Sequence, residues 1–124
     1  MLIVEDNLIN QELIKQMMTL LSCKVDCADN GKAAVEQVAQ QSYDLVLMDL
    51  RMPEMDGFDA TLEIRRNEHD NGRKPVPIVA LTADVVEGVV ERCHEIGMDG
   101  FLSKPVSLQQ LRETLTAWVP GYAD

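Results

Sequence analysis

Three carboxylates stand where apolar runs of the sequence end. Asp49 follows the apolar run 45–48, and the acidic pair Glu5-Asp6 follows the run 2–4. The carboxyl ends of the strands in a parallel α/β sheet meet at one edge, so these residues can converge there. Two unit charges about 4 Å apart interact by roughly 4 kcal/mol at an effective dielectric of ~20, so such a cluster calls for a cation. Oxygen-only ligands favour Mg²⁺. Any one acid alone fits a solvated residue at a loop start equally well.

Two further runs end in residues that can contact a phosphoryl group. The run 76–81 is followed by Thr82, and the short run 100–103 is followed by Lys104-Pro105. A hydroxyl and an ammonium beside a carboxylate and a divalent cation supply the hydrogen bonds and the neutralising charge that phosphoryl oxygens need. A lone Thr or Lys would mean little at such a position. The set at four separate strand ends predicts a phosphoryl-binding site.

These residues need a scaffold of alternating strands and helices. Short apolar runs near residues 1–4, 23–27, 44–48, 76–81 and 99–102 alternate with helical patterns. The five βα units predict an α/β fold, a single doubly wound domain with a parallel sheet. The polar stretch 67–75 is expected to be an exposed connection, with His69 in it. The fourth helix is expected from Asp84 to Gly97, and its valine- and glycine-rich first turns have weak intrinsic helicity.

Two of the expected helices have a clear start. Asn7 can cap the first helix, whose apolar stripe is expected to pack on the sheet. Ser107 and Gln110 have the spacing of a capping box at the start of the last helix. The stripes consist of Ile9, Leu13, Met17 and Leu20 in the first helix and of Leu108, Leu111, Leu115 and Trp118 in the last.

The whole chain resembles the receiver domain of two-component response regulators. The matching stretches are Val4-Glu5-Asp6-Asn7, Leu47-Met48-Asp49, Met52-Pro53, Met55-Asp56-Gly57, Ala80-Leu81-Thr82-Ala83 and Lys104-Pro105. The resemblance implies the flavodoxin-like receiver fold, with five helices and a five-stranded sheet in the order 2-1-3-4-5. It also implies Mg²⁺-dependent transfer of phosphate from a phosphohistidine to Asp49.

The same resemblance implies a role for each site residue. Asp6, Asp49 and the backbone carbonyl of Arg51 would bind Mg²⁺, with support from Glu5. The phosphoryl oxygens would be contacted by Thr82, Lys104 and the Ala83 amide. Phe101 falls at the aromatic switch position, which is often Tyr, so it can swing inward with Thr82 but has no hydroxyl. The face of the fourth helix, fifth strand and fifth helix would change shape in response.

Composition narrows the classes of partner. The 124 residues fit one domain, with the receiver domain expected over 1–120 and a C-terminal tail over 121–124. A formal net charge of −10 disfavours binding to nucleic acid or to an anionic membrane. No apolar stretch approaches the ~20 residues of a membrane span, so we expect a cytoplasmic domain, monomeric in isolation. Three cysteines without a Cys-x-x-Cys pair favour buried free thiols over a disulfide framework or a zinc site.

The expected partners are a histidine kinase dimerisation domain and a histidine-containing phosphotransfer domain. The stretches 5–12 and 98–105 look most like receiver domains of hybrid sensor histidine kinases, and the first strand starts at residue 1. We therefore expect a part of such a kinase, whose parent chain could be anchored in the inner membrane; a stand-alone regulator is the alternative. A phosphatase with an aspartyl nucleophile would need an acid where Arg51 stands. A non-phosphorylated interaction module would not need the complete set of site residues.

Overall fold

Five parallel strands form one sheet in the order β2-β1-β3-β4-β5. The computed structural model describes residues 1–83, 87–119 and 121–122. The strands are β1 (Leu2–Val4), β2 (Asp26–Ala28), β3 (Val46–Asp49), β4 (Ile78–Thr82) and β5 (Gly100–Ser103). The helices are α1 (Leu8–Leu20), α2 (Gly31–Gln40), α3 (Gly57–Asp70), α4 (Glu87–Glu95) and α5 (Leu108–Trp118). This confirms the predicted fold class and strand order.

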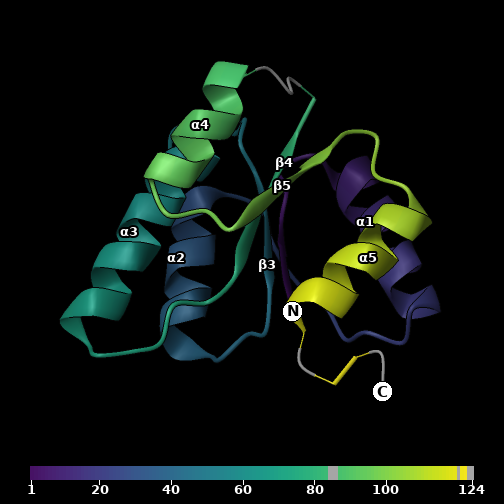
Figure 1. Cartoon of the computed structure of the whole chain (residues 1–124), viewed down its shortest axis with the longest axis horizontal. Coiled ribbons are helices and arrows are strands. Elements are labelled where there is room, and N and C mark those ends of the chain that lie inside the picture. The colour runs from purple at the N-terminus through teal and green to yellow at the C-terminus, as the bar shows by residue number, and fades with distance from the viewer. Residues whose placement is uncertain (84–86, 120, 123–124) are drawn as a thin grey trace.

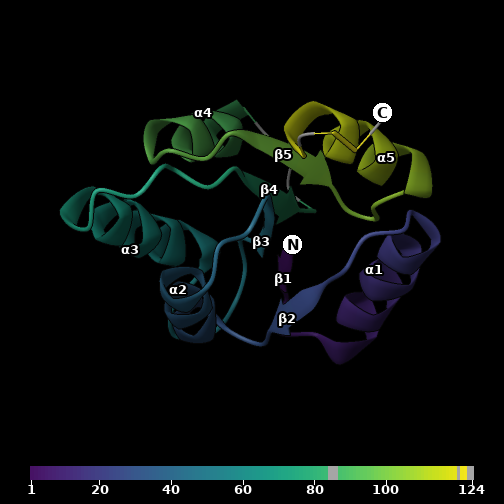
Figure 2. The ribbon, with the colours of Figure 1, turned by 90° about the horizontal axis from the view of Figure 1, so that it is seen from below.

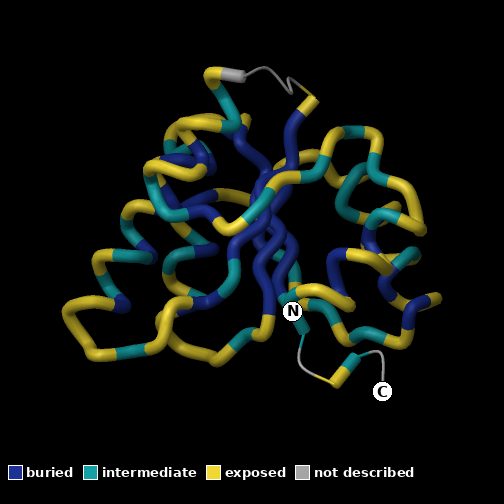
Figure 3. The backbone as a smooth tube through the Cα atoms, in the orientation of Figure 1, coloured by how far each residue is buried: buried dark blue, intermediate teal, exposed yellow. Residues whose placement is uncertain are grey.

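The helices cover both faces of the sheet. Helices α1 and α5 lie on one face, and α2, α3 and α4 lie on the other, as Figures 1 and 2 show from two directions. Figure 3 shows the central strands β1, β3 and β4 as the most deeply buried part of the chain, whereas the edge strands β2 and β5 are partly exposed. Each face has its own apolar core, because neighbouring strand residues point to opposite sides: Ile3 and Leu47 face α1 and α5, and Val4 and Met48 face the other layer. None of the described helices has the length and apolarity to cross a bilayer.

The strand register brings the carboxyl ends of the strands to one edge. Val4 pairs with Met48, Asp49 pairs with Leu81, and Thr82 pairs with Ser103. The residues in and directly after these pairs therefore lie side by side at this edge, although the first and the last of them are about a hundred residues apart in the chain. The sequence predicts the candidate site at this same edge.

Helix α1 packs on the sheet with a different stripe from the predicted one. Asn7 caps it as expected, accepting hydrogen bonds from the backbone amides of the second and third helical residues. The buried face consists of Ile14 and Met18, continued by Leu21 after the helix. Most of the predicted stripe is exposed: Ile9 by 73%, Leu13 by 50% and Leu20 by 74%, while Met17 packs at the edge of the core. Both stripes have helical spacing, and the stripe that packs against Leu47 and its neighbours on the sheet is the buried one.

Two predicted boundaries are wrong because of local hydrogen bonds. Strand β2 begins at Asp26 rather than near residue 23, because the Cys23 amide still bonds to the Met18 carbonyl in the turn after α1. Helix α3 continues to Asp70 and takes in the first half of the polar stretch, so His69 is helical. Among its last residues, Glu68 is buried, which gives this polar segment a packed face.

The other two helix predictions are confirmed in part. The capping box of Ser107 and Gln110 is formed, and Leu111 and Leu115 are buried, whereas Leu108 is exposed. Helix α4 is seen from Glu87. Residues 84–86, on which the interpretation of weak first turns depends, lie outside the described residues.

Arg65 of α3 holds the segment that follows the C-terminal end of α4. Its Nε and Nη2 atoms donate to the carbonyl oxygen of Gly97 at 3.0 and 2.8 Å, and Nη2 also lies 3.1 Å from Oδ2 of Asp99. Gly97 has a φ of +98°, in the left-handed region that favours glycine, and a β-carbon there would lie 3.3 Å from Nε of Arg65. Glu68 completes the group, with Oε1 at 2.7 Å from Nη1.

Candidate functional site

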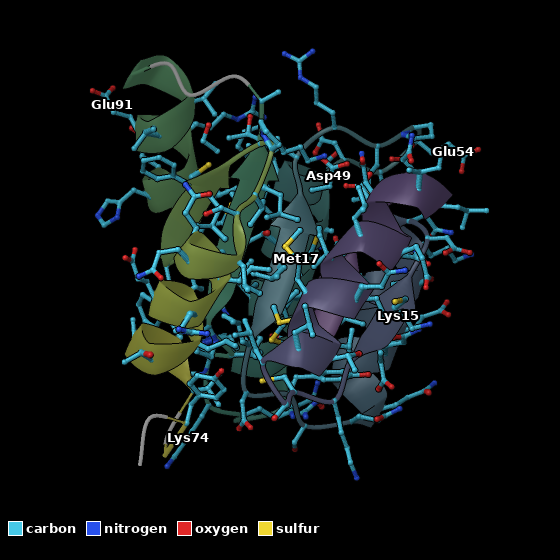
Figure 4. All side chains as sticks on the ribbon, turned by 90° about the vertical axis from the view of Figure 1, so that its right-hand side faces the viewer. Lys15, Met17, Asp49, Glu54, Lys74 and Glu91 are labelled. Carbon is cyan, nitrogen blue, oxygen red and sulfur yellow. The ribbon has the colours of Figure 1, made fainter. Side chains whose placement is uncertain are left out.

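The three predicted carboxylates lie together at the carboxyl edge of the sheet. Each of the three carboxylates, Glu5, Asp6 and Asp49, has one oxygen that lies within 4.8 Å of one oxygen of each of the other two. Figure 4 shows Asp49 at this edge. Glu5 is only 1% exposed and Asp49 only 4%, whereas Asp6 is exposed. Two of the three are therefore buried charges, unlike solvated acids at loop starts, and buried charges need compensation.

Asp49 is held in place by the chain that follows it. It is the last residue of β3, and the Arg51 amide donates to its Oδ1 at 3.1 Å. Helix α3 begins at Gly57 against the same residue, because a β-carbon on Gly57 would lie 2.3 Å from the Asp49 carbonyl oxygen. Only glycine allows that approach, so the backbone around the carboxylate is tightly confined.

Lys104 supplies the positive charge within the cluster. Its Nζ lies 2.9 Å from Oε2 of Glu5 and 3.3 Å from Oδ1 of Asp49. Burial lowers the pKa of Lys104, but the hydrogen bond to Glu5 and the charge of Asp49 outweigh it, so the pKa is raised and the ammonium stays protonated at neutral pH. The Lys104 amide also donates to the Thr82 carbonyl at 2.8 Å, and the Lys104-Pro105 peptide bond is cis.

Glu5 is anchored at both its side chain and its backbone. The Asn7 amide donates to Oε1 at 3.2 Å, while Lys104 holds Oε2. Nε2 of Gln11 donates to the Glu5 carbonyl at 3.1 Å and to Oδ1 of Asp29 at 3.0 Å. Sequence reasoning missed this role of Gln11, because no motif marks a side chain that reaches back to the backbone six residues earlier.

Thr82 completes the set on the neighbouring strand. It is the last residue of β4 and is buried, and Ala83 beyond it is exposed. Thr82 lines a cavity of about 510 Å³ together with Arg51, Met52, Phe58 and Val89 of α4. Phe101 on β5 is exposed. This cavity leaves room next to Thr82 for a rearranged side chain.

The donor set fits a divalent cation. Glu5, Asp6 and Asp49 carry three negative charges and Lys104 one positive charge, which leaves two negative charges to be balanced. All ligands that the cluster offers are carboxylate oxygens, the type that Mg²⁺ prefers.

Cys93 is buried in the core, and burial raises the pKa of its thiol. Cys23 and Cys27 are only half-buried, contrary to the prediction of burial, and none of the three forms a disulfide.

Comparisons with known proteins agree on the family. The family model for the response regulator receiver domain matches residues 1–116. The chain is 37% identical over 124 residues to hybrid signal transduction histidine kinase E of Dictyostelium discoideum and 39% identical over 117 residues to sensor histidine kinase GacS of Pseudomonas protegens. These matches cover 99% and 94% of this chain but span 7% and 13% of the two kinases.

Two solved structures resemble the fold closely. The receiver domain of sensor histidine kinase PA1611 from Pseudomonas aeruginosa, with a magnesium ion coordinated in its active site cleft, is 41% identical with a TM-score of 0.84. That match covers 94% of this chain and 93% of the other. The co-crystal structure of the Saccharomyces cerevisiae phosphotransfer protein Ypd1 with the receiver domain of Ssk1 gives 35% identity and a TM-score of 0.89. Here the coverage is 94% of this chain and 86% of the other.

Proposed function

This chain belongs to the response regulator receiver domain family, and we propose that it accepts a phosphoryl group on Asp49 in a two-component phosphorelay. The observation that carries the proposal is the buried Asp49 carboxylate, which lies within one small cluster with Glu5, Asp6 and Lys104. A buried carboxylate facing a cation site and an ammonium is a nucleophile whose attack on a phosphoryl group can be stabilised electrostatically. We assign the domain to residues 1–120, followed by a tail over 121–124.

The bond changes follow from the contacts of Asp49. Oδ1 already accepts from the Arg51 amide and from Lys104, so we expect Oδ2 to attack the phosphorus. The P–O bond to Asp49 forms as the P–N bond of a phosphohistidine breaks, and the imidazole leaves. Lys104, the Thr82 hydroxyl and the Ala83 amide would contact the phosphoryl oxygens. Because the transition state spreads charge over these oxygens, positioned donors lower the barrier.

Mg²⁺ is the cofactor that fits the cluster. Asp6, Asp49 and the Arg51 backbone carbonyl would hold it with support from Glu5, and the magnesium ion in the PA1611 receiver domain supports this assignment. When bound, the ion would neutralise charge on the phosphoryl oxygens. The protein contributes the confined backbone at Asp49 and the ammonium of Lys104.

The new phosphate would switch one face of the domain. Phosphorylation adds roughly −1.5 to −2 charge and new acceptor oxygens. Thr82 would move toward these oxygens, and Phe101, now exposed, would turn into the space that Thr82 leaves. Both residues lie on paired strands, so the face of α4, β5 and α5 would change shape. Without a hydroxyl, Phe101 would act through packing alone.

The exposed stripe of α1 is the surface that we assign to a phosphohistidine partner. Ile9, Leu13 and Leu20 are exposed, and Leu13 and Met17 line a cavity of about 330 Å³ that reaches Lys104. A histidine-containing phosphotransfer domain or a kinase dimerisation domain docked there would present its histidine to the site. The complex of Ypd1 with the Ssk1 receiver supports a partner of this class, and the two kinases above support a hybrid kinase as the parent chain.

Acetyl phosphate labelling tests the proposal. With Mg²⁺, the protein should gain one phosphoryl group by mass spectrometry, and chelation should prevent it. Asp49→Asn should abolish labelling, whereas the matched change Asp44→Asn, at an exposed position before β3, should not. Labelling of the Asp49→Asn variant at the parent rate would refute the assignment.

Three further measurements test the metal site and the class of partner. Asp6→Ala should weaken Mg²⁺ binding in calorimetry, and unchanged affinity would remove Asp6 from the metal site. A phosphorylated histidine-containing phosphotransfer domain should pass its phosphate to Asp49 within minutes. The acidic charge predicts no DNA binding at physiological salt, so a specific complex in a shift assay would contradict the partner assignment.

A further inference from the structure

Gln11 joins three segments beside the carboxylate cluster. It lies on α1, one turn after the Asn7 cap, and its side-chain amide donates two hydrogen bonds. One goes to the carbonyl of Glu5, in the loop after β1, and the other goes to Asp29, in the loop before α2. The two bonds are 3.1 and 3.0 Å long, and they use both N–H groups of the amide.

The bond to Glu5 acts on Asp6 as well. The carbonyl of Glu5 belongs to the peptide group that joins these two acids, so Gln11 fixes the plane of that peptide. The carboxylate of Glu5 has its own anchors in Asn7 and Lys104. Within the described parts of the chain, Asp6 has no hydrogen bond or ion pair to its carboxylate. The backbone therefore sets the place and direction from which the Asp6 side chain extends, and Gln11 holds that backbone.

We propose that Gln11 is a positioning residue that orients Asp6 for Mg²⁺. This inference rests on the proposed function, because it assumes that the cluster binds Mg²⁺ through Asp6. A residue that holds a metal ligand in place typically changes metal affinity by about 10- to 100-fold when it is lost. Gln11 holds the peptide of the ligand rather than its carboxylate, so we expect a weakening of about tenfold, the lower end of this range.

The test replaces Gln11 with a side chain of similar length and no donor. Gln11→Met keeps the helical propensity and loses both hydrogen bonds. The matched control is Gln16→Met, an exposed position on the same helix. Mg²⁺ affinity is measured by calorimetry on the whole chain, and the rate of labelling by acetyl phosphate is measured across a range of Mg²⁺ concentrations.

The expected result separates positioning from general stability. Gln11→Met should raise the Mg²⁺ concentration for half-maximal labelling about tenfold, in step with the calorimetric Kd, while the rate at saturating Mg²⁺ stays at the parent value. Gln16→Met should leave both quantities unchanged. A purely structural role would lower the unfolding temperature without changing the Mg²⁺ requirement.

Failure of this inference differs from failure of the proposed function. If the parent binds Mg²⁺ and Gln11→Met binds it equally well, the positioning role is wrong and the site assignment stands. A lower rate at saturating Mg²⁺ in Gln11→Met would also overturn the positioning role. If the parent itself binds no Mg²⁺, the proposed metal site is wrong.

Discussion

Replacing Lys104 with methionine tests how strongly the ammonium stabilises the two buried carboxylates. Its Nζ lies 2.9 Å from Glu5 and 3.3 Å from Asp49, and 23% of the side chain is exposed. At an effective dielectric of ~20, each contact corresponds to about 5 to 6 kcal/mol of attraction before the cost of removing the charges from water. Loss of one partner of a buried ion pair typically costs about 3 to 5 kcal/mol. Because Lys104 keeps some contact with water, we expect a loss of about 3 kcal/mol.

Urea unfolding with and without Mg²⁺ measures this loss. With chelator at pH 7, the variant should show the lower free energy of unfolding, because the three carboxylates then lack the counter-charge that Lys104 or Mg²⁺ supplies. A ligand at 100 times its Kd stabilises a folded protein by about 2.7 kcal/mol. The net charge of the cluster is −3 in the variant and −2 in the parent, because the variant lacks the Lys104 ammonium. Mg²⁺ should therefore bind the variant more tightly and stabilise it more.

The pH dependence has a defined sign. The pKa of Lys104 is raised in the folded protein, so the ammonium stabilises the fold fully below its unfolded pKa of about 10.4. The contribution is lost as the pH rises through the folded pKa. The difference in stability between parent and variant should therefore be constant from pH 7 to about pH 10 and shrink above it.

Lys74→Met provides the control. Lys74 is exposed, and Figure 4 shows it at the opposite end of the molecule from Asp49. A substitution there should change the free energy of unfolding by no more than about 0.5 kcal/mol. A loss below about 1 kcal/mol for Lys104→Met, or an equal gain from Mg²⁺ in variant and parent, would refute the reasoning.

Three other substitutions have specific expected results. Thr82→Ala should bind beryllofluoride but lose most of the hydrogen-exchange change that the mimic causes in α4 and β5; a response like that of the parent would contradict the switch. Gly57→Ala should cost about 3 kcal/mol in urea unfolding, because its β-carbon would lie 2.3 Å from the Asp49 carbonyl oxygen, and an unchanged midpoint would contradict that packing. Burial and the bond to an aspartate raise the pKa of Tyr43 to about 12, so Tyr43→Phe should remove a late step from an alkaline absorbance titration. Since the unfolded chain loses this proton first, Tyr43 favours unfolding above about pH 10.

The position of the site could be predicted because it depends on local sequence. Each functional residue follows an apolar run, and the edge at which parallel strands end is the same for all of them. The structure has Asp49, Thr82 and Lys104 at the edge of the sheet that this reasoning predicts. Their individual roles, by contrast, came from resemblance to a family and stay predictions until they are tested.

The contacts between segments could not be predicted in the same way. Helix α1 has two stripes at helical spacing, and only the residues of the sheet decide that Ile14 and Met18 are buried. The last turn of α3 forms from polar residues because Glu68 is paired with Arg65 and with the Val76 amide, 2.7 Å from each. The two hydrogen bonds of Gln11 likewise depend on two loops that only the fold brings together.

The two hydrogen bonds from Arg65 to the Gly97 carbonyl fix the C-terminal end of α4, so this end can serve as a pivot for the helix. The helix ends at Glu95, two residues before the carbonyl that Arg65 holds, and Val89 near its opposite end lines the same cavity as Thr82. A segment clamped at one end and displaced at the other moves as a lever about a pivot. We therefore expect a small shift near Thr82 to tilt α4 rather than to slide it. The far end would stay still, and the angle of the helix would carry the signal.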